Sequence, residues 1–194
     1  MIKSCKISAD GIFLNGVRQT IDFDVSEDWK KQLYKSLNLE YSKFHKMDDL
    51  SKMSLLSVAL LNESCNFKKF NDEEISLIFS NKNSSSFTDL KFKSSYSDQG
   101  NPSPSLFVYT LPNITIGEIS IFMKWFGENI FLISKDFNSV PFEHLLSIEF
   151  HKGASACLCG WVDKTEKIDE CFMFFVEENA EIYNKKMILD LFNQ

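Results

Sequence analysis

Runs of apolar residues separated by polar turns divide this chain into predicted strands. Residues 75–80 and 170–176 are apolar at nearly every position, which is typical of strands buried on both faces of a sheet. Residues 4–14 alternate around a turn, which indicates a strand that begins a small hairpin. The predicted strands are residues 4–14, with a turn at Asp10-Gly11 and a hairpin continuing to Phe23, and residues 75–80, 130–134, 154–162 and 170–176.

Apolar residues at three- and four-residue steps predict the helices. The pattern is strongest over residues 47–63, and residues 41–46 before it form a linker. Start and stop signals bound several of the others, because Ser, Pro and Gly favour helix ends. The predicted helices are residues 27–37 with Ser26 as N-cap, 47–63, 106–126 stopped by Gly127, 142–151 between Pro141 and Gly153, and 179–192.

Two segments stand out from this pattern. Residues 106–126 are apolar on nearly every side, so we expect a helix that is buried on more than one face. Residues 81–101 are polar and rich in serine, which favours a long functional loop. Asn71 and Glu74 resemble a capping pair just before the strand at residues 75–80.

The order of these elements predicts an α/β fold. Strands and helices alternate through much of the chain, so we expect one mixed, mainly parallel sheet of about five strands with helices on both faces. A length of 194 residues suits a single domain, 1–194, and internal repeats are absent. The expected core comprises Ile75, Leu77, Ile78, Phe79, Ile130, Leu132, Ile133, Leu158 and Phe174.

Composition narrows the function. The net charge is −6, and Arg18 is the one arginine among 21 basic residues, which argues against nucleic-acid binding. No apolar run approaches the ~20 residues of a membrane span. Met1 to Asp10 lacks the apolar core of a signal peptide. The five scattered cysteines then indicate reduced thiols and a cytoplasmic protein.

Few residue patterns suggest chemistry. Cys157 and Cys159 lie on one strand face but have the wrong spacing for a redox or zinc motif. His144 and His151 lie on one helix face without a third ligand, so we expect no metal. The serines at 84–86 lack a nucleophile elbow. Seven glycines without a phosphate-binding cluster predict no cofactor.

Three stretches together resemble a known family. Residues 45–64, HKMDDLSKMSLLSVALLNES, resemble the KMDRFSRLALAAAREAL helix of β-ketoacyl-acyl-carrier-protein synthases. Residues 102–134 are similar to the family's P…PNAAAGHIAIRLGLKGPNYTVSTACAS segment and share its Pro-Asn pair at Pro112 and Asn113. ACLCGWVD lies where the family has its ADVALAGGAE strand. The likeness spans roughly residues 45–163 and implies the N-terminal half of the thiolase-like condensing-enzyme fold.

The departures from this family imply a lost activity. The nucleophilic cysteine of the family corresponds here to Phe137 or Asn138. The two catalytic histidines of the family belong to a C-terminal half for which this chain has no room. We therefore expect a degenerate, truncated and non-catalytic relative.

The resemblance then implies a structural, chain-length-factor-type partner of an active ketosynthase, in fatty-acid, polyketide or aryl-polyene pigment synthesis. A homodimer, or a heterodimer with a full-length ketosynthase, would form where the strand at 130–134 meets its counterpart in a joined sheet, and an acyl carrier protein is a further possible partner. A lone half would leave part of residues 106–126 facing water. The expected interface residues are Ile130, Leu132, Ser134, Phe142, Leu145 and Leu146.

Two other functions stay open at this point. One is an acyl-transfer enzyme with an unrecognised nucleophile, for which Cys157 is the candidate. The other is a module that binds an acyl chain or an acyl carrier protein in an aromatic pocket.

Overall fold

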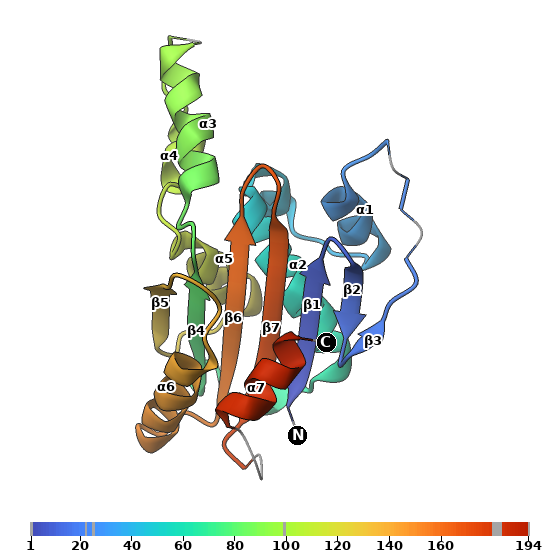
Figure 1. The fold of residues 1–194 in the computed structure, drawn as a ribbon, viewed down its shortest axis with the longest axis vertical. Helices are drawn as coiled ribbons and strands as arrows, with labels where there is room; N and C mark the ends of the chain where they lie inside the picture. The colour runs from blue at the N-terminus through green and yellow to red at the C-terminus, as the bar shows by residue number, and fades with distance from the viewer. Residues whose placement is uncertain (1, 22, 25, 99, 180–183, 194) are drawn as a thin grey trace.

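The computed structural model describes residues 2–21, 23–24, 26–98, 100–179 and 184–193. In this part of the chain, seven strands form one sheet in the order β3-β2-β1-β7-β6-β4-β5 (Figure 1). The strands are β1 (Lys3–Ser8), β2 (Gly11–Leu14), β3 (Val17–Arg18), β4 (Ile75–Asn81), β5 (Asn129–Ile133), β6 (Ala156–Lys164) and β7 (Asp169–Glu177).

The sheet is mixed, but it is not mainly parallel as the sequence predicted. Only β4 runs parallel to its neighbours, β5 and β6, and the other four pairings among the described residues are antiparallel. Short turns join β1 to β2 and β6 to β7, and a short turn can connect only antiparallel strands. The predicted strand at residues 4–14 forms β1 and β2, and β3 follows, which raises the strand count from the predicted five to seven in the described part of the chain.

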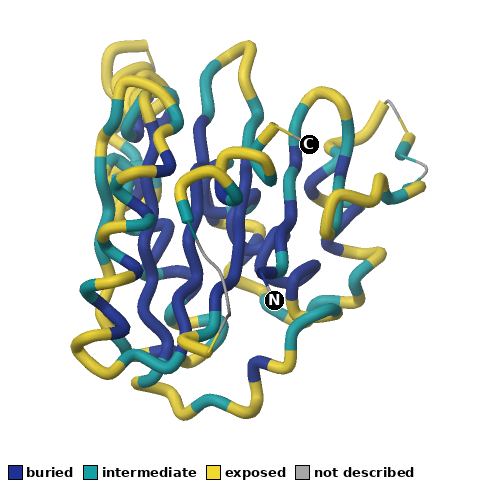
Figure 2. The backbone as a smooth tube through the Cα atoms, turned by 60° about the horizontal axis from the view of Figure 1, so that its bottom comes forward, coloured by how far each residue is buried: buried dark blue, intermediate teal, exposed yellow. Residues whose placement is uncertain are grey.

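Helices cover both faces of the sheet, as predicted. On one face α2 and α5 pack together over the larger core, and on the other α6 and α7 cover a second, aromatic core. Figure 2 shows the buried strands between the more exposed outer layers. The helices are α1 (Trp29–Ser36), α2 (Asp49–Ser64), α3 (Ser86–Ser97), α4 (Pro104–Val108), α5 (Ile114–Met123), α6 (Ser139–His151) and α7 (Lys185–Phe192), with short 3₁₀ turns η1 (Ser42–Lys46) and η2 (Phe67–Lys69).

The predicted helix at 47–63 is confirmed as α2. Asp48 is its N-cap, and the Asp48 Oδ1 accepts a hydrogen bond from the Ser51 backbone N at 3.0 Å. α2 is buried along most of its length because the sheet lies on one side and α1 and α5 on others. No helix in the described part of the chain is long and apolar enough to cross a bilayer.

The predicted central strand is confirmed as β4, which is buried at every position. The Glu74 Oε2 accepts from the Asn71 backbone N at 2.8 Å, as the capping pair predicted. Six of the nine expected core residues are buried, but the three on β5 are not: Ile130 and Leu132 are half-buried, and Ile133 is 57% exposed. The reason is that β5 lies at the edge of the sheet.

The long helix predicted over residues 106–126 is wrong. The chain forms α4 and α5, separated by a turn that contains Pro112. Proline has no backbone N–H, and its ring clashes with the carbonyl four residues earlier, so the helix cannot run through it. α5 ends at Lys124, whose φ of 58° is left-handed, before Gly127.

The loop predicted over residues 81–101 is also wrong, because it contains α3. This helix packs against α4, where the Phe92 and Phe107 rings lie 5.5 Å apart. Near its start, the Thr88 Oγ1 donates to the buried Asp48 carboxylate at 2.9 Å. Together α3 and α4 project beyond the end of the sheet (Figure 1).

The remaining differences concern element ends. α1 begins after Asp28, which caps it instead of Ser26, and the hairpin ends at Arg18, short of Phe23. α6 begins two residues before Pro141. The predicted C-terminal helix is confirmed over α7, while residues 180–183 lie outside the described part of the chain.

Candidate functional site

The segment after β5 holds the position where the resembled enzymes carry their nucleophilic cysteine. The sequence resemblance aligns Phe137 or Asn138 with this position, and the structure shows the surroundings of both. The Phe137 ring stacks on Phe192 of α7, with centroids 3.9 Å apart and planes at 10°. It also meets the rings of Phe142, Trp161 and Phe172 at 5.7–5.9 Å. A phenyl ring packed in this way offers no group that could attack a thioester.

Asn138, the other residue that the sequence resemblance aligns with the family's cysteine, has a structural role. It is exposed, and its Oδ1 accepts from the Val140 backbone N at 3.0 Å as the N-cap of α6. A side-chain amide is not a nucleophile towards a thioester, and the amide of Asn138 is engaged in capping α6. Neither position can therefore form an acyl-enzyme.

The three histidines do not form a catalytic pair. His144 and His151 are exposed on α6, and His45 packs edge-on against the Tyr34 and Phe44 rings near η1. Among the described residues, no group of three or more His, Cys, Asp or Glu side chains could hold a metal ion.

Cys157, the alternative nucleophile, lies in the middle of β6 and is fully buried. Burial, together with the negative charge of Glu149, raises the pKa of the Cys157 thiol to about 12. Cys159 lies on the same face of β6 in the same aromatic core. A buried, protonated thiol can neither be reached by an acyl thioester nor attack it, so the structure does not support Cys157 as a nucleophile.

The edge of β5 is the most accessible part of the sheet near this position. Within the described residues, β5 pairs with β4 and has no strand on its other side. Glu128 O accepts from Leu77 N, and Ser134 N donates to Asn81 O, each at 2.8 Å. Because successive residues of a strand point their hydrogen-bonding groups to opposite sides, those of residues 129, 131 and 133 point to the open edge.

The expected interface residues divide into two groups. Ile130, Leu132 and Ser134 lie on or just after β5 and are partly exposed. Phe142 and Leu146 are instead fully buried against the chain's own sheet, and Leu145 packs beside them in the second core. The inward face of α6 is therefore already occupied, so Phe142 and Leu146 cannot contact a partner as the sequence predicted.

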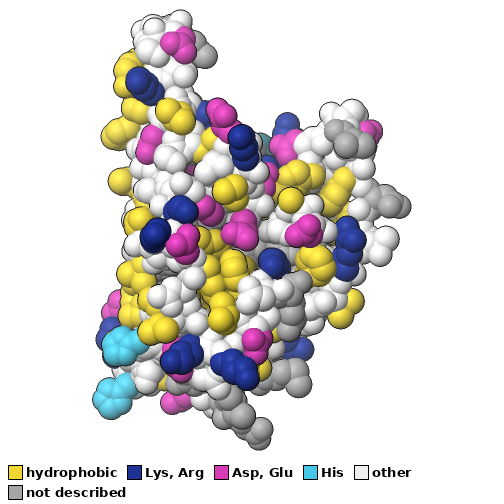
Figure 3. Space-filling view, viewed as in Figure 1, with side chains coloured by type: hydrophobic (Ala, Val, Ile, Leu, Met, Phe, Trp, Pro, Cys, Tyr) yellow, Lys and Arg dark blue, Asp and Glu magenta, His cyan; other side chains and the backbone are white. Residues whose placement is uncertain are grey.

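Exposed apolar side chains lie on α4, on α5, in the segments that follow these helices and on β5. The sequence placed most of them in the helix predicted over residues 106–126, part of which was expected to face water in a lone half. Figure 3 shows hydrophobic side chains along the side of the molecule formed by α3, α4, β5 and α6. The proline-induced break in residues 106–126 is the signal that could have located them. We call the following residues the β5-side surface: Phe107, Val108, Leu111, Ile121, Phe126 and Ile133, which are 48–68% exposed.

Comparison with solved structures identifies the fold. The ishigamide ketosynthase/chain length factor superimposes with a TM-score of 0.67 over 95% of this chain, at 14% identity. This chain has the ketosynthase and chain length factor fold. The resemblance seen in the sequence is thus confirmed at the level of the fold, and the chain spans 63% of that structure's chain.

Two further structures agree. A ketosynthase in complex with its chain length factor from Xenorhabdus doucetiae gives a TM-score of 0.57 at 12% identity, covering 100% of this chain and 88% of that chain. A type II PKS acyl-carrier protein in complex with its ketosynthase bound to the hexaketide gives 0.62 at 13% identity, covering 84% and 52%. No protein-family model and no curated protein matches the chain.

Proposed function

We propose that this chain is a non-catalytic, chain-length-factor-type partner of a full-length ketosynthase. The observation that carries the proposal is the open edge of β5. The packed Phe137 ring, which the sequence resemblance aligns with the nucleophile position, supports it. A chain with this fold but without an accessible nucleophilic thiol and a histidine pair to activate it lacks the groups that condensation requires. It keeps the surface through which such a chain can join a partner.

The β5 edge suits a strand of the partner. Open, apolar strand edges are aggregation hazards that proteins normally cover. Residues 129, 131 and 133 present their backbone groups, and Ile133 adds a 57% exposed apolar side chain. Backbone pairing would fix the register, while the β5-side surface would supply apolar contact. A stable complex should bury at least about 1,000 Å² in total.

The similar structures suggest the pathway. They include ketosynthases with chain length factors, and one contains an acyl-carrier protein and a bound hexaketide. We therefore place the proposed partnership in fatty-acid, polyketide or aryl-polyene synthesis, with an acyl carrier protein as a further partner. The heterodimer is preferred over a homodimer because a homodimer of this chain would contain no catalytic cysteine.

Co-expression with a ketosynthase from the same cell tests the partnership and the missing activity together. The complex is purified, incubated with an acyl thioester and analysed by intact mass spectrometry. We expect the two chains to co-purify and the acyl adduct to appear on the ketosynthase alone. Failure to co-purify contradicts the partnership, whereas an adduct on this chain contradicts the non-catalytic role.

Replacing Phe137 with cysteine should not restore condensation, because none of the three histidines lies in a pair that could activate the new thiol. The substitution also removes a ring from the second core and should cost about 3 kcal/mol, as for other large-to-small core changes. The matched variant Asn138→Cys places a thiol at an exposed position. Both variants should match a buffer blank in a condensation assay, and turnover by Phe137→Cys alone would contradict this account of the site.

A further inference from the structure

The helices α3 and α4, which we call the arm, lead into half of the β5-side surface. Phe107 and Val108 lie on α4 and Leu111 follows it, and all three are 48–62% exposed. Tyr109, between Val108 and Leu111, is only 6% exposed. Tyr109 is therefore the side chain that fixes this exposed apolar segment to the rest of the molecule.

A buried carboxylate holds Tyr109. The Tyr109 hydroxyl donates a hydrogen bond of 2.9 Å to the Oε1 of Glu118 on α5. The same oxygen forms an ion pair with the Lys43 Nζ of η1, also at 2.9 Å. Burial, together with the hydrogen bond to Glu118, raises the pKa of the Tyr109 phenol, so the hydroxyl keeps its proton and remains a donor at neutral pH.

Stability alone does not explain Glu118. Its side chain is 3% exposed, and its Oε2 has no hydrogen-bond partner among the described residues. Removing a carboxylate from water carries a penalty that one ion pair does not fully offset, and apolar side chains of similar volume often give an equally stable protein. What the carboxylate adds is geometry, because a hydrogen bond fixes the direction of its partner.

A second buried carboxylate holds the start of α3. The Thr88 Oγ1 donates to the Oδ2 of Asp48, the N-cap of α2. Apart from Thr88, only Ser95 is buried on α3, and α4 contributes no buried residue. Isolated helices shorter than about 12–15 residues are marginal in water. The contacts at the base of the arm therefore decide where it lies.

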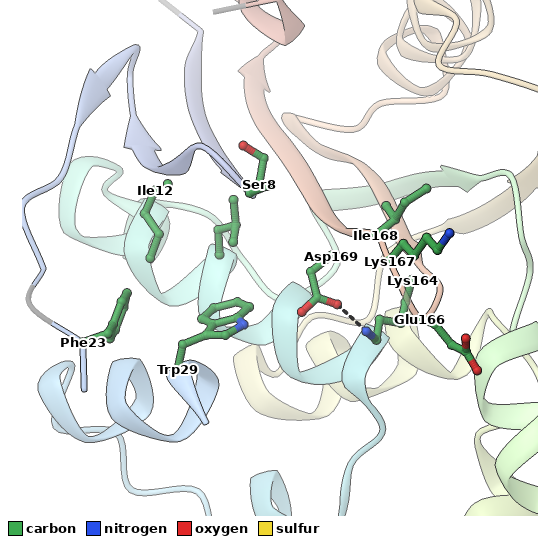
Figure 4. A pocket seen from close by; sticks show the side chains of 12 residues that line it. Ser8, Ile12, Phe23, Trp29, Lys164, Glu166, Lys167, Ile168 and Asp169 are labelled. Carbon is green, nitrogen blue, oxygen red and sulfur yellow. Dashed lines mark ion pairs between the residues drawn. The ribbon is translucent and has the colours of Figure 1, made fainter. Parts of the chain in front are cut away.

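Charged side chains support the same base. The centre of the Phe87 ring lies 4.2 Å from the Lys91 Nζ and 4.4 Å from the Lys164 Nζ. Asp169 pairs with Lys164 at 2.7 Å, as the dashed line in Figure 4 shows, and Asp49 pairs with Lys91 at 3.0 Å. The Lys91 side chain is 48% exposed, and ion pairs in contact with water contribute little. The two buried carboxylates are thus the more specific contacts.

We propose that Glu118 and Asp48 are positioning residues for recognition of the ketosynthase, because they hold the arm in the orientation in which Phe107, Val108 and Leu111 contact the partner. A segment that is ordered before binding loses less conformational freedom on association, which favours affinity. This inference rests on the proposed function. It adds to that function two residues that lie inside the chain and act through Tyr109 and Thr88.

Hydrogen–deuterium exchange of the chain by itself tests whether these hydrogen bonds hold the arm. The double variant Thr88→Val/Tyr109→Phe removes both hydroxyls and keeps side chains of similar shape. We expect the amides of α3 and α4 to exchange at least tenfold faster, and those of β4 to be unchanged. Equal exchange of the arm in the double variant and the unaltered chain would overturn the proposal.

Ser76→Ala is the matched control. The Ser76 Oγ also donates to a buried carboxylate, the Glu149 Oε2 at 2.8 Å, but this contact joins β4 to α6 and not the arm to α2 or α5. Exchange of the arm should stay unchanged in this variant. Faster exchange of α3 and α4 in Ser76→Ala would show that any loss of stability releases the arm, and would also overturn the proposal.

The dissociation constant of the complex with the ketosynthase tests the positioning itself. We expect Thr88→Val/Tyr109→Phe to bind at least tenfold more weakly, and Ser76→Ala and Thr88→Ser, which keeps the hydroxyl, to bind as the unaltered chain does. Normal affinity of the double variant would overturn this inference and leave the partnership standing. If the unaltered chain forms no complex, the proposed function fails, and this inference fails with it.

Discussion

At the scale of single residues, two glycines lie where neighbouring atoms leave no room for a side chain. A Cβ at Gly127 would overlap the carbonyl oxygen of Ile75 and lie 2.9 Å from the Ile75 carbonyl carbon. A Cβ at Gly160 would lie 2.6 Å from the Phe79 ring. Gly127 was predicted from the sequence as a helix stop, but its role is to let the chain entering β5 pass against β4.

Gly127→Ala should therefore destabilise the protein by about 3 kcal/mol, the upper end of the usual cost of overpacking, because a backbone atom cannot rotate away. Gly117→Ala is the matched control. Its Cβ would meet nothing within 4 Å, and it lies inside α5, so a gain of about 0.5–1 kcal/mol is expected. Urea unfolding measures both, and equal effects would contradict the close approach at Gly127.

Buried thiols give a second prediction at this scale. Burial raises the pKa of Cys157 from 9.0 to about 12 in the folded chain, so the unfolded chain releases this proton first as the pH rises. The stabilising contribution is complete below pH 9 and is lost between pH 9 and 12. The loss is about 1.4 kcal/mol for each pH unit and thiol within that window.

We expect the midpoint temperature of thermal unfolding to decrease when the pH is raised from 8 to 10. The decrease should be smaller in Cys157→Ala. Other buried thiols, such as Cys171, titrate in the same direction, so the variant should keep part of the slope. An unchanged slope in Cys157→Ala would show that this thiol is not protected in the folded state.

At the scale of elements, the sequence correctly predicted the helices and strands that lie in the interior and carry clear apolar patterns. β4, β6, β7 and α2 lie in the interior, and their apolar runs show it. α3 was missed because its sequence is polar, and contacts that no pattern encodes hold it, such as the Thr88–Asp48 hydrogen bond. Within residues 106–126 the single long helix was wrong because Pro112 divides it, whereas the expectation that part of this segment faces water is confirmed.

The candidate site, like the fold, was predicted only in part from the sequence. The partly exposed residues of β5 were predicted from the sequence, and the alignment of Phe137 or Asn138 with the nucleophile position stays a prediction from the resemblance. The burial of Phe142 and Leu146 was not predicted, because the sequence of α6 does not show whether its apolar side chains face the chain's own sheet or a partner.

α7 offers a test of how the second core is closed. Ile188 is fully buried under this helix, and its neighbour Leu189 is 42% exposed. Ile188→Ala should lower the free energy of unfolding by about 2–4 kcal/mol, whereas Leu189→Ala should change it by no more than about 0.5 kcal/mol. Equal losses, measured by urea unfolding, would show that α7 does not close this core.

At the scale of the whole molecule, helices cover both faces of the sheet, and its edge strands in the described part of the chain are the two-residue β3 and the longer β5. α2 and α5 close one face and α6 and α7 the other, while the β5 edge and the β5-side surface remain exposed. Contacts along this side, and not across a sheet face, are therefore the expected means of joining a ketosynthase.

Sedimentation of the co-expressed complex tests this claim most directly. Ile133→Pro removes a backbone donor from the open edge of β5 without touching the ladder to β4, and Ile133→Thr keeps the donor while removing the same apolar contact. We predict a heterodimer for the unaltered chain and for Ile133→Thr, and dissociation for Ile133→Pro at micromolar concentration. A heterodimer that persists unchanged in Ile133→Pro would contradict strand pairing at this edge.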